Sequence, residues 1–185
     1  MLDDLISVDQ LSPTIIDRIF AITPDMQAIT QNKQKPCDYL KGCILGNLFF
    51  EASTRSRMSF SSAFMYLGGQ VNSTTGVVFS SISKGESLAD TARVIASYCD
   101  ILVIRHPDLG SAAMAAEHAN IPVINAGDGP GEHPTQALLD LYTIYKEKKS
   151  LSNLNICMVG DLKYGRTVHS LARLLALYPK ITLTF

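Results

Sequence analysis

The sequence predicts an α/β fold, with a parallel sheet flanked by helices and then the first strand, helix and strand of a second α/β domain. Short apolar runs of strand length alternate with segments whose apolar side chains recur at helical spacing. The β-branched run Ile101–Ile104 is typical of a parallel strand buried on both faces. With 46% hydrophobic residues, the 185-residue chain can fill a substantial core.

The amino-terminal part is expected to be helical. Ser12 and Pro13 supply a capping residue and a proline in the first helical position. Pro24 either kinks this helix or lies in the first turn of a second helical segment, and the polar stretch Gln31–Lys35 ends it. The first strand, Cys43–Phe50, follows.

The alternation continues to the end of the chain. A helix that carries Phe60, Phe64 and Leu67 on one face ends at the pair Gly68-Gly69. The further extended segments expected are Gln70–Ser73, Gly76–Phe79, Ile101–Ile104, Ile121–Asn125, Leu154–Val159 and Ile181–Phe185. The further helical segments expected are Leu88–Cys99, Ala112–Ala119, Leu138–Tyr145 and Thr167–Leu177, with a polar loop at Ser80–Gly85 and a glycine-rich loop at Ala126–Gly131.

This order predicts three parts. Residues 1–133 form a first domain, residues 134–150 an interdomain helix and linker, and residues 151–185 the start of a second domain. The chain ends on the hydrophobic strand Ile181–Phe185 without a helix to cover it. We therefore expect the second domain to be truncated.

Composition excludes several functions. The net charge of −1 offers no positive field for nucleic acid or an anionic membrane surface. The cysteines form no C-x-x-C pair and no histidine lies at zinc-finger spacing, so we expect reduced thiols and no metal. The amino terminus is acidic, and no apolar run approaches the ~20 residues that span a bilayer. The default expectation is a cytoplasmic protein.

The stretch Phe49–Arg57 predicts an anion site. Ser53 lies at the N-cap position of the helix after the first strand, where unpaired backbone N–H groups point outward. Arg55 and Arg57 add positive charge there, which suits a phosphate. The alternative is that Ser53 merely caps a surface helix and both arginines are solvated.

Three basic residues, Arg55, Arg105 and His133, each come just past the end of a predicted strand. The carboxyl ends of parallel strands share one edge of a sheet, so these side chains should converge despite their distance in sequence. His133 precedes Pro134 at a helix start, where the helix dipole disfavours an added proton and favours a neutral imidazole. A helix-capping role and a general-base role remain alternatives for this histidine.

Five motifs occur in one order along the chain: Ser53-Thr-Arg-Ser-Arg57, Lys84-Gly-Glu-Ser-Leu-Ala-Asp-Thr91, Arg105-His-Pro107, His133-Pro-Thr-Gln136 and Gly160-Asp-Leu-Lys-Tyr-Gly-Arg166. Together they resemble the catalytic chain of the aspartate carbamoyltransferase family, over essentially the whole sequence but only about the first half to two-thirds of that family's chain. The resemblance implies a carbamoyl-phosphate domain followed by an aspartate domain. It also implies transfer of a carbamoyl group from carbamoyl phosphate to L-aspartate, in pyrimidine biosynthesis, without a metal or organic cofactor.

The resemblance assigns a role to each matching residue. The phosphate cradle is Ser53, Thr54, Arg55 and Ser56, the last in a position where the family more often has threonine. Arg105 would touch the phosphate and the carbonyl oxygen, and His133 would donate to that oxygen. Gln136 would accept from the carbamoyl NH₂ group, and Arg166 would bind a carboxylate of aspartate.

Two further residues lie on the polar loop. The resemblance implies that Lys84 and Ser80 reach the active site of a neighbouring subunit in a homotrimer, where Lys84 contacts phosphate and aspartate. By itself Lys84 is typical of a solvated loop lysine, and Ser81 or Ser83 can replace Ser80 in this role. Whether a regulatory chain also binds is left open.

Some residues receive no role from the resemblance, and some rival functions remain to be weighed. His106, His118 and His169 are interpreted as structural, and Arg57 as either a structural ion pair or a substrate contact. One rival function is ornithine carbamoyltransferase, opposed by Lys84-Gly85-Glu86 and by the cationic Lys163–Arg166. Another is a carbamoyl-phosphate-binding fragment without turnover. A dinucleotide-binding turn at Val159–Asp161 is disfavoured because the third glycine of that motif is missing.

Overall fold

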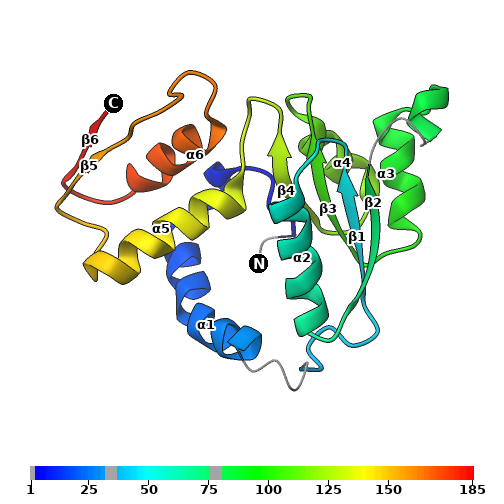
Figure 1. Cartoon of the computed structure of the whole chain (residues 1–185), viewed down its shortest axis with the longest axis horizontal. Helices are drawn as coiled ribbons and strands as arrows, with labels where there is room; N and C mark the ends of the chain where they lie inside the picture. The colour runs from blue at the N-terminus through cyan, green and yellow to red at the C-terminus, as the bar shows by residue number, and fades with distance from the viewer. Residues whose placement is uncertain (1–2, 32–36, 76–80) are drawn as a thin grey trace.

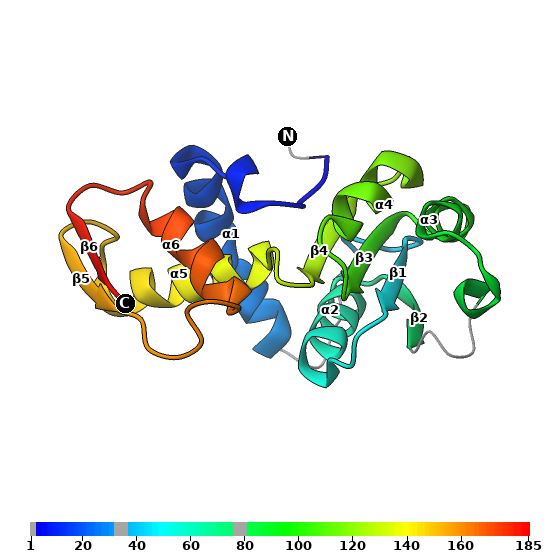
Figure 2. The same ribbon diagram turned by 90° about the horizontal axis from the view of Figure 1, so that it is seen from above.

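The computed structural model describes residues 3–31, 37–75 and 81–185. One half of the molecule is a parallel four-stranded sheet with helices on both faces, and the other half contains three helices and a small two-stranded sheet (Figure 1, Figure 2). The order of the larger sheet is β2-β1-β3-β4. Its strands are β1 (Ile44–Phe49), β2 (Gln70–Thr75), β3 (Ile101–His106) and β4 (Val123–Asp128). The predicted α/β fold with a parallel sheet is confirmed.

Helix α2 (Thr54–Tyr66) covers one face of this sheet, and helices α3 (Leu88–Ala96) and α4 (Ser111–Ala119) cover the other (Figure 1). Successive side chains of a strand point to opposite faces. In β3, Leu102 and Ile104 therefore pack with α3 and α4, whereas Val103 packs in the cluster that contains Phe64 of α2. Both faces of the central strand β3 are thus buried, whereas most described side chains of the edge strand β2 are exposed.

The same alternation sets the directions of Arg105 and His106, the two polar residues that end β3. Arg105 shares the face of Val103 and so points toward the side of α2, while His106 points the other way, where its ring lies 4.9 Å from that of Phe50. The expectation that Arg105 lies just past the end of the strand was wrong. It is paired inside β3, opposite Phe49, because the ladder to β1 continues for one residue beyond the β-branched run.

Other predicted strand boundaries also differ from those in the structure. Strand β4 was expected at Ile121–Asn125 but begins at Val123 and continues to Asp128, because its pairing with β3 extends through a register shift into the glycine-rich segment. Strand β5 (Leu154–Cys157) ends before Val159, which is 90% exposed. The expected segment Gly76–Phe79 lies outside the described residues, and Ser81–Lys84 forms a short 3₁₀ turn, η2.

The second half of the molecule is built from segments distant in sequence. Helix α1 (Pro13–Gln31), which follows the 3₁₀ turn η1 (Val8–Gln10), is one continuous helix with Pro24 inside it. It packs with α5 (Pro134–Lys148) and α6 (Arg166–Leu175) (Figure 1). Strand β5 pairs in parallel with β6 (Ile181–Thr184). The buried members of this core are Val8, Leu11, Ile16, Phe20, Ala137, Leu138, Leu141, Leu151, Met158, Leu174 and Leu175.

Helix α1 therefore shares a core with residues beyond 133, although it comes first in the sequence. The division of the chain at residues 133 and 150 stays a prediction. Among the residues that the structure describes, no helix has the length and apolar character needed to cross a bilayer.

The centre of β3 offers a stability test. Leu102 is 0% exposed, so Leu102→Ala should lower the free energy of unfolding by about 3 kcal/mol through lost burial and a residual cavity. Leu109→Ala is the control, because that side chain is 69% exposed and should cost less than about 0.5 kcal/mol. Urea denaturation measures both, and equal losses would contradict the position of β3 at the centre of the core.

Candidate active site

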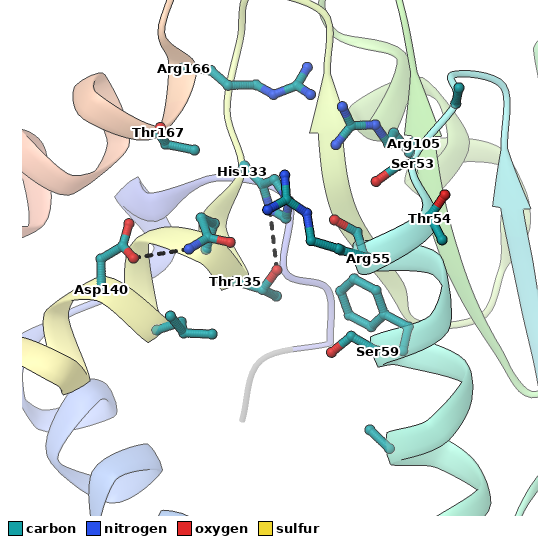
Figure 3. A pocket seen from close by; sticks show the side chains of 16 residues that line it. Ser53, Thr54, Arg55, Ser59, Arg105, His133, Thr135, Asp140, Arg166 and Thr167 are labelled. Atoms are coloured by element: carbon teal, nitrogen blue, oxygen red, sulfur yellow. Dashed lines mark hydrogen bonds between the residues drawn. The ribbon is translucent and has the colours of Figure 1, made fainter. Parts of the chain in front are cut away.

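A cavity of about 990 Å³ opens at the carboxyl edge of the large sheet, between α2 and α5 (Figure 3). Its walls come from the start of α2, the end of β3, the start of α5 and the start of α6. The lining residues are Ala52, Ser53, Thr54, Arg55, Ser56, Ser59, Phe60, Ala63, Arg105, His133, Thr135, Gln136, Leu139, Asp140, Arg166 and Thr167.

The start of α2 forms one wall. Ser53 is the N-cap residue, with extended backbone angles, but its side chain makes no capping hydrogen bond. The Arg57 amide donates to the Ser53 carbonyl at 3.3 Å, so the amides ahead of it belong to the unpaired first turn. The capping part of the alternative is therefore wrong, because Ser53 makes no side-chain cap, whereas Arg55 is exposed, as the alternative expected. Hydroxyl and backbone N–H groups remain for an anion at the positive end of the helix dipole.

Arg105 lies deep at the edge of the sheet. Its Nη1 donates to the carbonyl of Ala126 at 3.2 Å, and its Nε lies 3.1 Å from Glu51 Oε2. Within the described part of the chain, neither Arg105 Nε nor Glu51 Oε2 makes an aligned hydrogen bond. The attraction between these two buried atoms is therefore that of an ion pair. Burial, with the nearby positive charge of Arg166, lowers the pKa of Arg105, although an arginine stays charged at neutral pH.

Arg166, the first residue of α6, approaches the same carboxylate. Its Nη2 lies 3.5 Å from Glu51 Oε2, and its Nη1 donates to the carbonyl of Gly129. The guanidinium also lies against Gly127, where an added Cβ would be 2.9 Å from Arg166 Cζ. With φ of +117° at this position, glycine satisfies both the backbone conformation and the close approach.

His133 is the N-cap residue of α5 and is only 6% exposed. Its ring makes no capping hydrogen bond, which removes the capping alternative. Burial, and then the positive charges of Arg166 and Arg105, lower the pKa of His133 to about 4. The ring is therefore neutral at pH 7, and Thr135 Oγ1 lies 3.3 Å from its Nδ1 (Figure 3). When Nδ1 accepts from that hydroxyl, Nε2–H is the donor that remains.

The loop between β4 and α5 is held by buried polar groups. Asp128 Oδ1 accepts from the Glu132 amide at 2.8 Å and from Asn125 Nδ2 at 3.1 Å, and its Oδ2 accepts from the Gly110 amide at 3.0 Å. Asn125 Oδ1 in turn accepts from the Gly127 amide at 2.8 Å. These bonds fix the path of the chain that leads to His133.

Glu132 joins this loop to two other segments. Its carboxylate accepts from the Ser7 hydroxyl at 2.6 Å and from the Val8 amide at 2.8 Å. It also accepts from Arg173 Nη1 of α6 at 2.8 Å, and Arg173 pairs with Asp9 as well. The amino-terminal segment and α6 are thereby tied to the residue next to His133.

Gln136 and Asp140 lie one turn apart on α5. Gln136 Nε2 donates to Asp140 Oδ1 at 2.9 Å (Figure 3). Burial raises the pKa of Asp140, and the hydrogen bond from Gln136 offsets part of that effect. An acidic group thus lines a cavity that is otherwise rich in arginine.

Most of the predicted site residues come together here. The cavity contains Ser53, Thr54, Arg55, Ser56, Arg105, His133, Gln136 and Arg166. Lys84 lies in η2 and does not line this cavity, and Ser80 falls outside the described residues. Arg57 does not line it either, and its backbone carbonyl accepts from Asn47 Nδ2 at 3.1 Å.

Three polar residues that bond to the predicted site residues, Glu51, Thr135 and Asp140, were not predicted from the sequence. Glu51 follows β1 directly, so the strand-end rule that selected Arg105 would also have selected it. Thr135 lies inside the His133–Gln136 motif, and Asp140 follows Gln136 at the i+4 spacing of helix neighbours. Within residues 3–31, 37–75 and 81–185, no group of three or more His, Cys, Asp or Glu side chains could hold a metal ion.

The neutrality of His133 can be tested by NMR. The ring should titrate with a midpoint of about 4, and Arg166→Gln should raise this midpoint because one neighbouring cation is removed. The unfolded chain takes up this proton near pH 6.5 and the folded chain does not, so the free energy of unfolding should fall by about 3 kcal/mol as pH drops from 7 to 4. Arg93→Gln, on the exposed surface of α3, is the control. A midpoint near 6.5 would contradict the burial of the ring.

Comparison with known proteins identifies the family to which the chain is similar. A family model described as aspartate/ornithine carbamoyltransferase, carbamoyl-P binding domain, matches residues 3–146. The aspartate carbamoyltransferase catalytic subunit of Dichelobacter nodosus is 55% identical over 185 residues, covering 98% of this chain and 53% of the relative. That of Archaeoglobus fulgidus is 52% identical over 178 residues, covering 96% and 59%. The chain spans about half the length of the curated relatives it matches.

Solved structures agree with this result. The catalytic subunit of M. jannaschii aspartate transcarbamoylase superposes with a TM-score of 0.90 at 46% identity, covering 98% of this chain and 59% of that one. Aspartate transcarbamoylase from Trypanosoma cruzi, in complex with carbamoyl phosphate and aspartate, superposes with a TM-score of 0.90 at 44% identity, covering 97% and 59%. Sequence, fold and the arginine-lined cavity therefore lead to one conclusion: this chain belongs to the aspartate/ornithine carbamoyltransferase family.

Proposed function

We propose that this chain binds carbamoyl phosphate and forms the carbamoyl-phosphate half of an aspartate carbamoyltransferase. The whole enzyme would transfer the carbamoyl group to the amino group of L-aspartate, giving N-carbamoyl-L-aspartate and phosphate for pyrimidine biosynthesis in the cytoplasm. The observation that carries this proposal is the cavity itself, where the start of α2, three arginines and a neutral histidine meet. The Trypanosoma cruzi relative in complex with carbamoyl phosphate and aspartate supports it.

The phosphate would lie at the start of α2, held by the cradle Ser53–Ser56. Arg105 would bridge the phosphate and the carbonyl oxygen, and His133 would donate to that oxygen. As the neutral amine attacks, a C–N bond forms and negative charge moves onto the carbonyl oxygen. The C=O bond then re-forms as the C–O bond to phosphate breaks, and the proton lost by the nitrogen would leave with the phosphate. Fixed donors around that oxygen stabilise the developing charge, which is the largest catalytic contribution available to this set of residues.

The remaining roles follow from the same proposal. Gln136 would accept from the carbamoyl NH₂ group, and Arg166 would pair with a carboxylate of aspartate. Residues 1–133 would be the carbamoyl-phosphate domain, 134–150 the interdomain helix and linker, and 151–185 the start of the aspartate domain. Lys84 and Ser80 would act in the cavity of a neighbouring subunit of a homotrimer, where Lys84 would also reach aspartate.

A specific observation favours aspartate over ornithine as the second substrate. Arg166 reaches the cavity from α6 and is part of its lining, so the side facing the second substrate carries a cation. A guanidinium attracts the carboxylate of an acidic substrate and repels the ammonium group of a basic one.

Calorimetry tests the first half of the proposal. The 185-residue chain should bind inorganic phosphate and carbamoyl phosphate, and Arg105→Ala should weaken both roughly 10- to 100-fold through loss of charged hydrogen bonds. Arg93→Ala is the matched control, since that arginine is exposed and pairs with Asp90 on α3. Aspartate-dependent phosphate release by this chain alone should be absent or very weak. Failure of the unmodified chain to bind either ligand would overturn the proposal.

The shared site can be tested by mixing subunits. Lys84→Ala chains and Arg105→Ala chains should each bind carbamoyl phosphate weakly, because each lacks one cation of every site. If Lys84 acts across an interface, mixed oligomers contain some sites with both cations, and a fraction of the tight binding should return on mixing. The unmixed Lys84→Ala and Arg105→Ala chains set the baseline, and mixing either of them with Arg93→Ala chains shows the recovery expected when one partner has both cations. No recovery in verified mixed oligomers would contradict the shared site.

A further inference from the structure

Asp140 is an unexpected side chain for an anion-binding cavity. It lies on the wall formed by α5, across from the start of α2 (Figure 3). A carboxylate there weakens the attraction of the cavity for phosphate and pays a desolvation penalty, which is visible as its raised pKa. A compensating role is therefore needed.

The contact with Gln136 supplies such a role. An ionised carboxylate can only accept hydrogen bonds, so the 2.9 Å contact with Asp140 Oδ1 must be made by the amide nitrogen of Gln136. The amide oxygen is then the polar atom of that side chain left for other partners. Gln136 lines the same cavity, so an acceptor rather than a donor is available to a ligand there.

We propose that Asp140 is a positioning residue that fixes the carboxamide of Gln136 with its oxygen available to the ligand, and thereby selects an acyl phosphate that carries NH₂ over one that carries CH₃. This inference rests on the proposed function, because it deepens the ligand preference of the same cavity. Without Asp140 the terminal torsion of glutamine has two nearly equivalent orientations, and one of them presents N–H to the ligand NH₂ group.

The competing explanation is that Asp140 only stabilises α5 as an i, i+4 partner of Gln136. In that case its replacement would change the stability of the chain but not the preference between two ligands of the same shape and charge. The ratio of two affinities therefore separates a positioning role from a structural one.

The experiment uses two stable phosphonates on the 185-residue chain. Phosphonoacetamide carries the NH₂ group, acetonylphosphonate has CH₃ in its place, and inorganic phosphate reports on the cradle alone. Calorimetry with the unmodified chain should give roughly tenfold tighter binding of the amide than of the ketone, because one buried donor is satisfied. Asp140→Asn should reduce this preference to about twofold or less, since Asn can pair with either orientation of Gln136.

Three controls sharpen the result. Asp140→Glu keeps a carboxylate and should restore part of the preference. Asp25→Asn removes the same charge from an exposed position on α1, away from the cavity, and should leave the preference intact. In a Gln136→Met background, Asp140→Asn should have no further effect on the preference. Asp140→Ala, which removes the acceptor, serves as a second variant if Asp140→Asn does not fold.

The outcomes distinguish the proposed function of the cavity from the positioning role of Asp140. If the unmodified chain binds none of the three ligands, the proposed function fails. If it binds them, but Asp140→Asn and Asp140→Ala keep the full preference for the amide, the inference about Asp140 is wrong while the proposed function stands. The inference would also be overturned if Asp140→Asn reduced the preference for the amide as much in the Gln136→Met background as in the unmodified chain. Asp140 would then act through its charge and not through Gln136.

Discussion

The candidate site depends on one electrostatic contact, the convergence of two guanidinium groups on the carboxylate of Glu51. Arg105 from β3 and Arg166 from α6 lie 3.1 and 3.5 Å from the same oxygen. Two largely buried cations would repel each other, and the carboxylate between them offsets that repulsion. It also joins the edge of the large sheet to the start of α6. The same contact therefore shapes the cavity and holds the two halves of the molecule together.

The two arginines in turn set the chemistry of His133. The ring is buried at the start of α5, and both cations further disfavour its protonation. A neutral imidazole can donate a hydrogen bond without adding to the positive charge of the cavity. The loop before it is fixed by Asp128 and Glu132, and Glu132 reaches Arg173 on α6. Helix α6 therefore contacts residues at the edge of the cavity through both Arg166 and Arg173.

How far the sequence predicts this site differs between residues. The position of Ser53–Ser56 at the helix start was predictable, because an N-cap residue, a helix start and a basic side chain lie within four consecutive positions, and these residues line the cavity. The approach of Arg105 and His133 was predictable from the edge rule for parallel sheets. Boundaries were less accurate at β3 and β4, where backbone pairing with a neighbouring strand extended each strand past its apolar run.

The sequence by itself determined the alternation of strands and helices, the helix start with unpaired N–H groups at Ser53 and the set of basic side chains, because these are encoded in short stretches of chain. Only the tertiary structure decided that Arg105 faces α2, that Glu51 lies between two arginines, and that α1 packs in the same core as α6. It also decided the orientation of the Gln136 amide, through its bond to Asp140. Each of these depends on burial and on the distance between specific atoms, and neither quantity is defined until the elements have packed together.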